Sequence, residues 1–122
     1  MKLRVLIVDD DASIRESMEM ALEGRYSVAL ACHGVAALEV LARQPIDLVL
    51  VDLMMPVLDG PGFVAEAKRR GLRVPIIIMS AGVDLRRRSQ QLGVVDYMNK
   101  PISLDVLEQK IDQVVAASIA VP

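Results

Sequence analysis

Three aspartates, at two places in the sequence, have the residue type and spacing to bind a metal ion. Asp9 and Asp10 are adjacent and follow the apolar run Leu3–Val8, and Asp52 follows a second apolar run, Asp47–Val51. Carboxylates that are brought together repel one another unless protons or a cation neutralise them. Oxygen-only ligands favour a hard ion such as Mg²⁺, and the single histidine and single cysteine are too few for a closed zinc site. We therefore expect these three aspartates to form a Mg²⁺ site.

Two further polar residues follow apolar runs in the second half of the chain. Ser80 comes after Pro75–Met79, and Lys100 comes after the weaker run Val94–Met98. A carboxylate, a divalent cation, a lysine and a hydroxyl are the groups needed to transfer a phosphoryl group onto aspartate, because the cation and the lysine stabilise charge on the transferring oxygens. Asp52 is the candidate nucleophile, since the adjacent pair is better suited to holding the metal.

These side chains can meet only if the apolar runs are strands of one sheet. Several of the runs are rich in Val and Ile without alternation, which is typical of parallel strands covered on both faces. Segments with helical spacing separate them and are bounded by cap, Pro and Gly signals. Five strands and five helices are predicted: strands Leu3–Val8, Tyr26–Ala31, Asp47–Val51, Pro75–Met79 and Val94–Met98, and helices from Asp11 to Gly24, around Val35–Leu41, from Pro61 to Gly71, over Val83–Leu92 and over Leu104–Val115.

Alternating strands and helices predict a doubly wound α/β domain, because parallel strands are joined by right-handed helical crossovers. Ligands of such sheets bind beyond the carboxyl ends of the strands, where the strand order reverses. The candidate residues all follow strands, so they are predicted to lie at this edge. Asp11 is expected to cap a helix, the Asp59–Gly60 pair to form a turn, and His33 to be a surface residue.

The composition limits the possible classes of protein. The chain has 122 residues, of which 53% are apolar and 25% charged, which fits one folded domain and excludes a disordered chain. Only three residues are aromatic, so a base-stacking surface for nucleic acid is not expected. One cysteine cannot form an internal disulfide, and no apolar run reaches the length of a membrane helix. We expect a cytoplasmic protein with no membrane contact and no direct nucleic-acid binding.

Charge is distributed unevenly along the chain. Residues 1–66 carry five basic and eleven acidic groups, whereas residues 67–122 carry nine basic and five acidic groups. The basic excess has two readings, a solvated helix face or a docking surface for a partner. Its members are Lys68, Arg69, Arg70, Arg73, Arg86, Arg87 and Arg88.

Four sequence pieces, in order, resemble the receiver domain of two-component response regulators, including the chemotaxis regulators. They are Val8-Asp9-Asp10-Asp11, the segment from Asp52 through Met55-Pro56 to Asp59-Gly60, then Ser80-Ala81, and finally Asp96-Tyr97 with Lys100-Pro101. The resemblance covers nearly the whole chain, with a receiver domain over residues 1–117 and a short tail over 118–122. It implies a flavodoxin-like sheet of order 2-1-3-4-5 and a cis bond before Pro101.

The resemblance also implies a role for each matching residue. Asp52 matches the phosphoacceptor, which takes its phosphoryl group from a phosphohistidine on a sensor histidine kinase or phosphotransfer protein. Asp9 and Asp10 match the Mg²⁺ ligands, together with Asp52 and the backbone carbonyl of Met54. Three more matches concern the phosphorylated state: Ser80 is the hydroxyl that turns toward the phosphate, Lys100 pairs with it, and Tyr97 is an aromatic switch.

The resulting expectation is a phosphorylation-dependent signalling switch that is no enzyme beyond its own phosphorylation and dephosphorylation. A downstream protein would bind the face of the fourth helix, fifth strand and fifth helix, including Arg86–Arg88, and the domain would be a monomer or a phosphorylation-dependent dimer. Three alternatives stay open: an adaptor that has lost phosphorylation, an Asp-nucleophile phosphatase, and a flavin or nucleotide carrier. The phosphatase is disfavoured because Met54 stands where such enzymes have a second acid, and the carrier because three aspartates follow the first strand.

Overall fold

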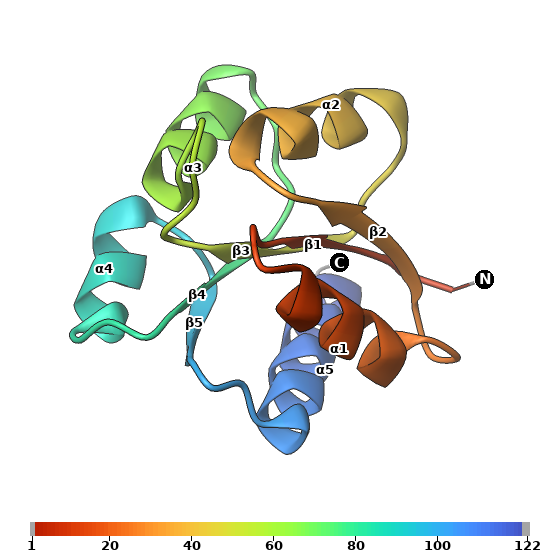
Figure 1. Ribbon diagram of the computed structural model, residues 1–122. Coiled ribbons are helices and arrows are strands. Elements are labelled where there is room, and N and C mark those ends of the chain that lie inside the picture. The colour runs from red at the N-terminus through yellow and green to blue at the C-terminus, as the bar shows by residue number, and fades with distance from the viewer. Residues whose placement is uncertain (1, 121–122) are drawn as a thin grey trace.

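Five strands alternate with five helices in the computed structural model, which describes residues 2–120 (Figure 1). The strands are β1 (Arg4–Val8), β2 (Ser27–Ala31), β3 (Leu48–Asp52), β4 (Ile76–Ser80) and β5 (Asp96–Asn99). The helices are α1 (Ala12–Leu22), α2 (Gly34–Arg43), α3 (Gly60–Arg69), α4 (Leu85–Leu92) and α5 (Leu104–Ala120). All paired strands are parallel, in the order β2-β1-β3-β4-β5, so the predicted fold class is confirmed.

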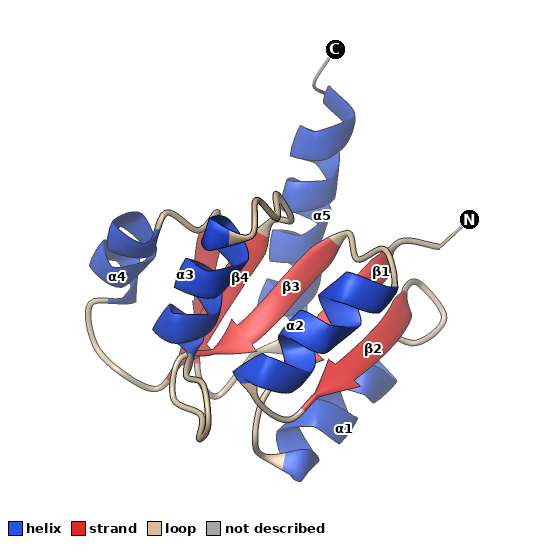
Figure 2. Cartoon of the chain, turned by 90° about the horizontal axis from the view of Figure 1, so that it is seen from above, coloured by secondary structure: helices blue, strands red, loops and turns tan. Residues whose placement is uncertain are grey.

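Helices cover both faces of the sheet, which makes three layers (Figures 1 and 2). Helices α1 and α5 lie on one face, and α2, α3 and α4 lie on the other. Alternate residues of each central strand therefore enter different cores: Val5 and Ile7 of β1 pack with the α1 and α5 side, and Leu6 and Val8 pack with the other side. Burial on both faces explains why these strands read as continuous apolar runs.

The strand order reverses between β1 and β3, and this places the candidate site. β1 pairs with β2 on one side and β3 on the other, and Val8 is the register partner of Val51. Asp9 and Asp52, the next residue in each chain segment, therefore leave neighbouring strands at the same edge. A crevice at this point is where doubly wound sheets bind ligands.

Most elements begin or end one or two residues from the predicted bounds, and the differences that affect the site or the end of the chain are in β3, β4, β5 and α5. β3 and β4 extend one residue further, so Asp52 and Ser80 are the last residues of their strands. β5 begins at Asp96, because the N–H of Val94 bonds to the carbonyl of Ser89 and finishes the turn after α4. α5 continues to Ala120, so the backbone of residues 118–120 is helical where a tail was predicted, and residues 121–122 lie outside the described part. Among helices of the described chain, none has the length and apolarity needed to cross a membrane.

Candidate functional site

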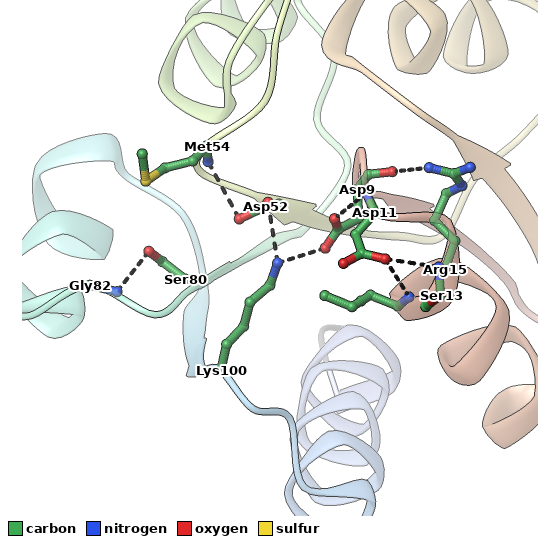
Figure 3. Close-up of polar contacts among 10 residues, drawn as sticks. Asp9, Asp11, Ser13, Arg15, Asp52, Met54, Ser80, Gly82 and Lys100 are labelled. Carbon is green, nitrogen blue, oxygen red and sulfur yellow. Dashed lines mark hydrogen bonds and ion pairs between the residues drawn. The ribbon is translucent and has the colours of Figure 1, made fainter.

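The three predicted carboxylates lie together at the carboxyl edge of the sheet. Figure 3 shows two of them, Asp9 and Asp52, on either side of the Lys100 ammonium. One oxygen from each of Asp9, Asp10 and Asp52 lies within 4.8 Å of the others. Asp9 is fully buried and Asp52 is 5% exposed, whereas Asp10 is exposed to solvent. Three acidic oxygens at this spacing, with one side open to water, fit a hard divalent cation that keeps part of its hydration shell.

Lys100 lies between two of these carboxylates and donates to both. Its Nζ atom is 2.8 Å from Asp9 Oδ2 and 3.2 Å from Asp52 Oδ2 (Figure 3). The lysine is held at this edge because its backbone N–H bonds to the carbonyl of Ser80, and the Lys100–Pro101 peptide bond is cis, as the resemblance implied. One ammonium thus offsets part of the negative charge of three carboxylates.

Burial sets the electrostatics of the pocket. It raises the pKa of Asp52 above its usual value, and the negative charge of Asp9 adds to the increase, although Lys100 opposes it. Burial alone would lower the pKa of Lys100, but the hydrogen bond to Asp9 and the charges of Asp52 and Asp9 outweigh it, so this pKa is raised. Lys100 therefore stays charged at neutral pH, whereas ionisation of Asp52 is less favourable than that of a free aspartate.

The other predicted site residues, Ser80, Met54 and Tyr97, come from three different segments of the chain. The hydroxyl of Ser80 accepts a hydrogen bond from the N–H of Gly82 (3.0 Å) and lies on the β4–α4 side of Lys100 (Figure 3). The N–H of Met54 donates to Asp52 Oδ1 at 3.4 Å, and the Met54 side chain is 77% exposed. Tyr97 is half-buried in β5, with the Lys110 ammonium 4.5 Å from its ring centre. The switch role of Tyr97 and the metal contact of the Met54 carbonyl stay predictions.

Residues that were expected to be structural serve as helix caps. Asp11 accepts hydrogen bonds from the N–H groups of Ser13 and Ile14 at the start of α1. Asp59 accepts from Gly62 at the start of α3. His33, which was expected at the surface, is the half-buried N-cap residue before α2, where its Nδ1 atom accepts from the N–H of Ala36, so the single histidine has a structural contact.

Sequence reasoning missed Arg15, which reaches the pocket from the first turn of α1. Its Nη1 atom donates to the carbonyl oxygen of Asp9 at 2.6 Å (Figure 3). The available signal was a basic residue six positions after the first aspartate, one turn into a helix that starts at the site. A long side chain there points back along the helix toward the preceding strand.

Gly60 was also missed as a residue important for the site, although it packs closely against the end of β3, the strand that carries Asp52. A Cβ atom on Gly60 would lie 2.6 Å from Leu53 Cα and 2.7 Å from the carbonyl oxygen of Asp52. Both are backbone atoms, so Gly60 allows α3 to start directly against the end of β3.

We expect Gly60→Ala to destabilise the protein by about 2–3 kcal/mol, because the added methyl group pushes on the backbone of β3. Gly62→Ala is the matched control in the same helix, since its methyl group would meet only side-chain atoms: the tip of Leu58 at 2.7 Å and Asp59 Oδ1 at 3.1 Å, both of which can shift. Urea unfolding of both variants measures the difference. Equal stability of the two would contradict the backbone contact at Gly60.

The fold and the pocket define a class: a doubly wound α/β domain with an acidic pocket that could hold a cation at its switch point, and a lysine between two carboxylates. Comparison with protein families agrees, since the family model of the response regulator receiver domain matches residues 5–112. The chain belongs to this family, the receiver domains of two-component signalling.

Individual relatives are consistent with this assignment. The chain is 39% identical over 110 residues to the response regulator MprA of Mycobacterium sp. (strain KMS), which is 88% of this chain and 48% of that protein. It therefore spans about half the length of the curated relatives it matches. Among solved structures, the Francisella response regulator 1452 receiver domain is 27% identical with a TM-score of 0.88, covering 95% of this chain and 98% of that one. The chemotaxis response regulator CheY4 of Vibrio cholerae is 25% identical with a TM-score of 0.86, covering 93% and 99%.

Proposed function

We propose that this domain is a phosphorylation-dependent switch that accepts a phosphoryl group on Asp52 in the presence of Mg²⁺. The observation that carries the proposal is the contact of Lys100 with both Asp9 and Asp52 beside the open carboxylate of Asp10. The donor would be a phosphohistidine on a sensor histidine kinase or a phosphotransfer protein, which is the partner that membership of the family implies. A cytoplasmic location belongs to the same proposal.

Each residue of the pocket would have a separate role in phosphoryl transfer. A carboxylate oxygen of Asp52 attacks the phosphorus, the P–N bond to the donor histidine breaks, and the imidazole leaves with the electron pair. Mg²⁺ held by Asp9, Asp10 and Asp52 would supply positive charge to the phosphoryl oxygens. Lys100 already lies 3.2 Å from Asp52 Oδ2, so it can contact an oxygen of the group attached there. Ser80 and Tyr97 would then respond to the new charge at the ends of β4 and β5.

Incubation with Mg²⁺ and acetyl phosphate tests the proposal directly. We expect an acid-stable, base-labile adduct on the wild type that is absent from Asp52→Ala and absent when Mg²⁺ is removed by a chelator. Retained folding of the variant is checked by circular dichroism. A wild type that folds but forms no adduct would favour the alternative of a receiver-like adaptor.

The downstream partner is proposed to bind the face of α4, β5 and α5, and the arginines of α4 are the first place to look. Arg86, Arg87 and Arg88 are exposed, and within residues 2–117, whose side chains the structure describes, none of their guanidinium groups has an ion-pair partner. The basic residues of α3 differ, because Lys68 bonds to the carbonyl of Leu92, and Arg69 and Arg70 pair with Glu66. Lys68, Arg69 and Arg70 therefore have partners within or next to α3, whereas the three arginines of α4 have no ion-pair partner among the described side chains.

Charge reversal in α4 is expected to weaken partner binding by about tenfold without changing phosphorylation by acetyl phosphate. The Arg86→Glu/Arg88→Glu variant keeps the fold, because it also places acids in the first turn of α4, where the helix dipole favours them. Affinity for the partner, measured at low and at high salt, checks the prediction. A variant whose affinity and salt dependence match the wild type would place the docking surface elsewhere.

A further inference from the structure

Every polar atom of Asp9 has a partner in the structure. Its N–H donates to the carbonyl of Ala31 (3.1 Å), its Oδ1 accepts from the N–H of Asp11 (2.9 Å), and its Oδ2 accepts from Lys100 (2.8 Å). The remaining atom, the carbonyl oxygen, accepts from Arg15 Nη1 at 2.6 Å. Asp9 is fully buried, so bulk water does not compete for the polar atoms of Asp9.

The Arg15 contact fixes the peptide group that joins Asp9 to Asp10. A peptide group is planar, so a hydrogen bond to its carbonyl oxygen also sets the direction of the N–H and Cα that follow. Asp10 is the exposed carboxylate of the three, and in the described residues its side chain has no hydrogen bond to protein. Its position therefore depends on its backbone. Arg15 bonds to the carbonyl of Asp9, on the side of Asp9 opposite to Lys100 (Figure 3).

We propose that Arg15 is a positioning residue for the cation site: it orients the Asp9–Asp10 peptide so that the Asp10 carboxylate faces Asp52. This inference rests on the proposed Mg²⁺-dependent function and adds a residue to it. Arg15 touches neither the cation nor the phosphoryl group in this role. It acts through the main chain, as groups outside the ligand shell commonly do when they orient ligands.

Simple electrostatics predicts the opposite effect, and this makes the proposal testable. Removing a positive charge near a cation site reduces repulsion, so charge alone predicts tighter Mg²⁺ binding after Arg15 is replaced. Loss of positioning predicts weaker binding, by about tenfold to a hundredfold as for other orienting groups. The sign of the change separates the two effects.

The experiment titrates Mg²⁺ alone into the purified chain and three variants, with isothermal calorimetry as the readout. Arg15→Met removes the donor and the charge at similar side-chain length, and Arg15→Lys keeps the charge but not the guanidinium. Arg43→Met removes the same charge as a control, because Arg43 is exposed on α2 and its side chain makes no ion pair or hydrogen bond within the described residues. The N–H of Asp11 bonds to Asp9, so its hydrogen-exchange rate measures, without metal, how firmly the backbone after β1 is held.

We expect at least a tenfold higher dissociation constant for Arg15→Met, an intermediate value for Arg15→Lys, and no weakening for Arg43→Met. Binding by Arg15→Met that is equal to or tighter than wild type would overturn the proposal, and so would equal weakening in Arg15→Met and Arg43→Met. If the wild type itself binds no Mg²⁺, the proposed function fails separately. Asp11 exchange then decides, since faster exchange in Arg15→Met supports positioning and unchanged exchange overturns it.

Discussion

Replacing Lys100 by methionine is expected to destabilise the protein by about 3 kcal/mol at neutral pH without Mg²⁺. The lysine is the only ammonium that the described structure places in contact with Asp9 and Asp52, and these two carboxylates are almost fully buried. Without the ammonium of Lys100, two negatively charged carboxylates would lie close together in the protein interior. Phosphorylation of the variant should also be lost, because Lys100 is the proposed contact of the phosphoryl oxygens.

The pH and metal dependence of the Lys100→Met variant identify the cause. In the wild type, burial and the charge of Asp9 raise the pKa of Asp52, and Lys100 counteracts part of this increase. Without Lys100 the pKa of Asp52 should therefore rise further. A carboxyl with a raised pKa in the fold stabilises the protein while it is protonated and loses that contribution as the pH rises. The variant should therefore recover stability at low pH, and Mg²⁺ should restore it at neutral pH by replacing the missing positive charge.

Lys110→Met is the matched control, since Lys110 forms a similar ion pair outside the pocket. Its Nζ atom lies 2.7 Å from Asp96 Oδ1, and the two side chains are 22% and 25% exposed. This pair has one acid and more access to water, so its loss should cost about 1 kcal/mol and should not respond to Mg²⁺. Thermal unfolding with and without Mg²⁺ measures both variants. Equal losses that Mg²⁺ leaves unchanged would show that Lys100 acts only as an ordinary ion pair.

The fold could be predicted because its strongest physical signals are local. Strands buried on both faces must be continuously apolar, as Leu48–Val51 shows, and helix caps such as Asp11 satisfy backbone groups within three residues. The carboxylates could be predicted because parallel strands bring their carboxyl ends to one edge. Only the doubly wound class came from these signals, whereas the full strand order and the cis bond before Pro101 came from the family resemblance.

Contacts between distant backbone atoms were not predictable from the same signals. Gly60 has the sequence of an ordinary turn after Asp59, and nothing local shows that it lies against Leu53 and the carbonyl of Asp52. Arg15 falls among polar residues on a helix, and its acceptor is a carbonyl group, which every residue has. Such contacts depend on the position and direction of the first turn of a helix relative to the end of the preceding strand. Only the assembled fold determines this geometry.

Asp52→Asn should remove the proposed phosphoacceptor and, at the same time, stabilise the protein by on the order of 1 kcal/mol at pH 7 without Mg²⁺. Burial raises the pKa of Asp52 above 3.8, and the charge of Asp9 adds to it, so the ionised form is unfavourable in the fold. Asparagine has nearly the same shape and no charge. The substitution gives up the attraction to Lys100, but Lys100 keeps its 2.8 Å contact with Asp9.

The sign of the pH dependence follows from the same raised pKa. The wild-type fold binds the Asp52 proton more tightly than the unfolded chain does, so this group contributes stability below pH 3.8, and the contribution is lost as the pH rises through the raised pKa. Asparagine cannot titrate. The stability advantage of Asp52→Asn should therefore grow as the pH rises from about 4 to 7.

Thermal unfolding across this pH range, without and with Mg²⁺, tests the prediction, and Glu39→Gln, an exposed acid on α2, controls for the change in net charge. At pH 7 the melting temperature of Asp52→Asn should exceed that of the wild type by about 4 °C. Mg²⁺ should narrow the gap, because on the proposed function it would bind the wild-type fold through three carboxylates and the variant through two. A melting temperature below that of the wild type at pH 7 without metal would mean that the attraction of Lys100 for Asp52 outweighs burial and the repulsion by Asp9. The ionised Asp52 carboxylate would then stabilise the unmodified fold, and the proposed phosphorylation would have to overcome that stabilisation.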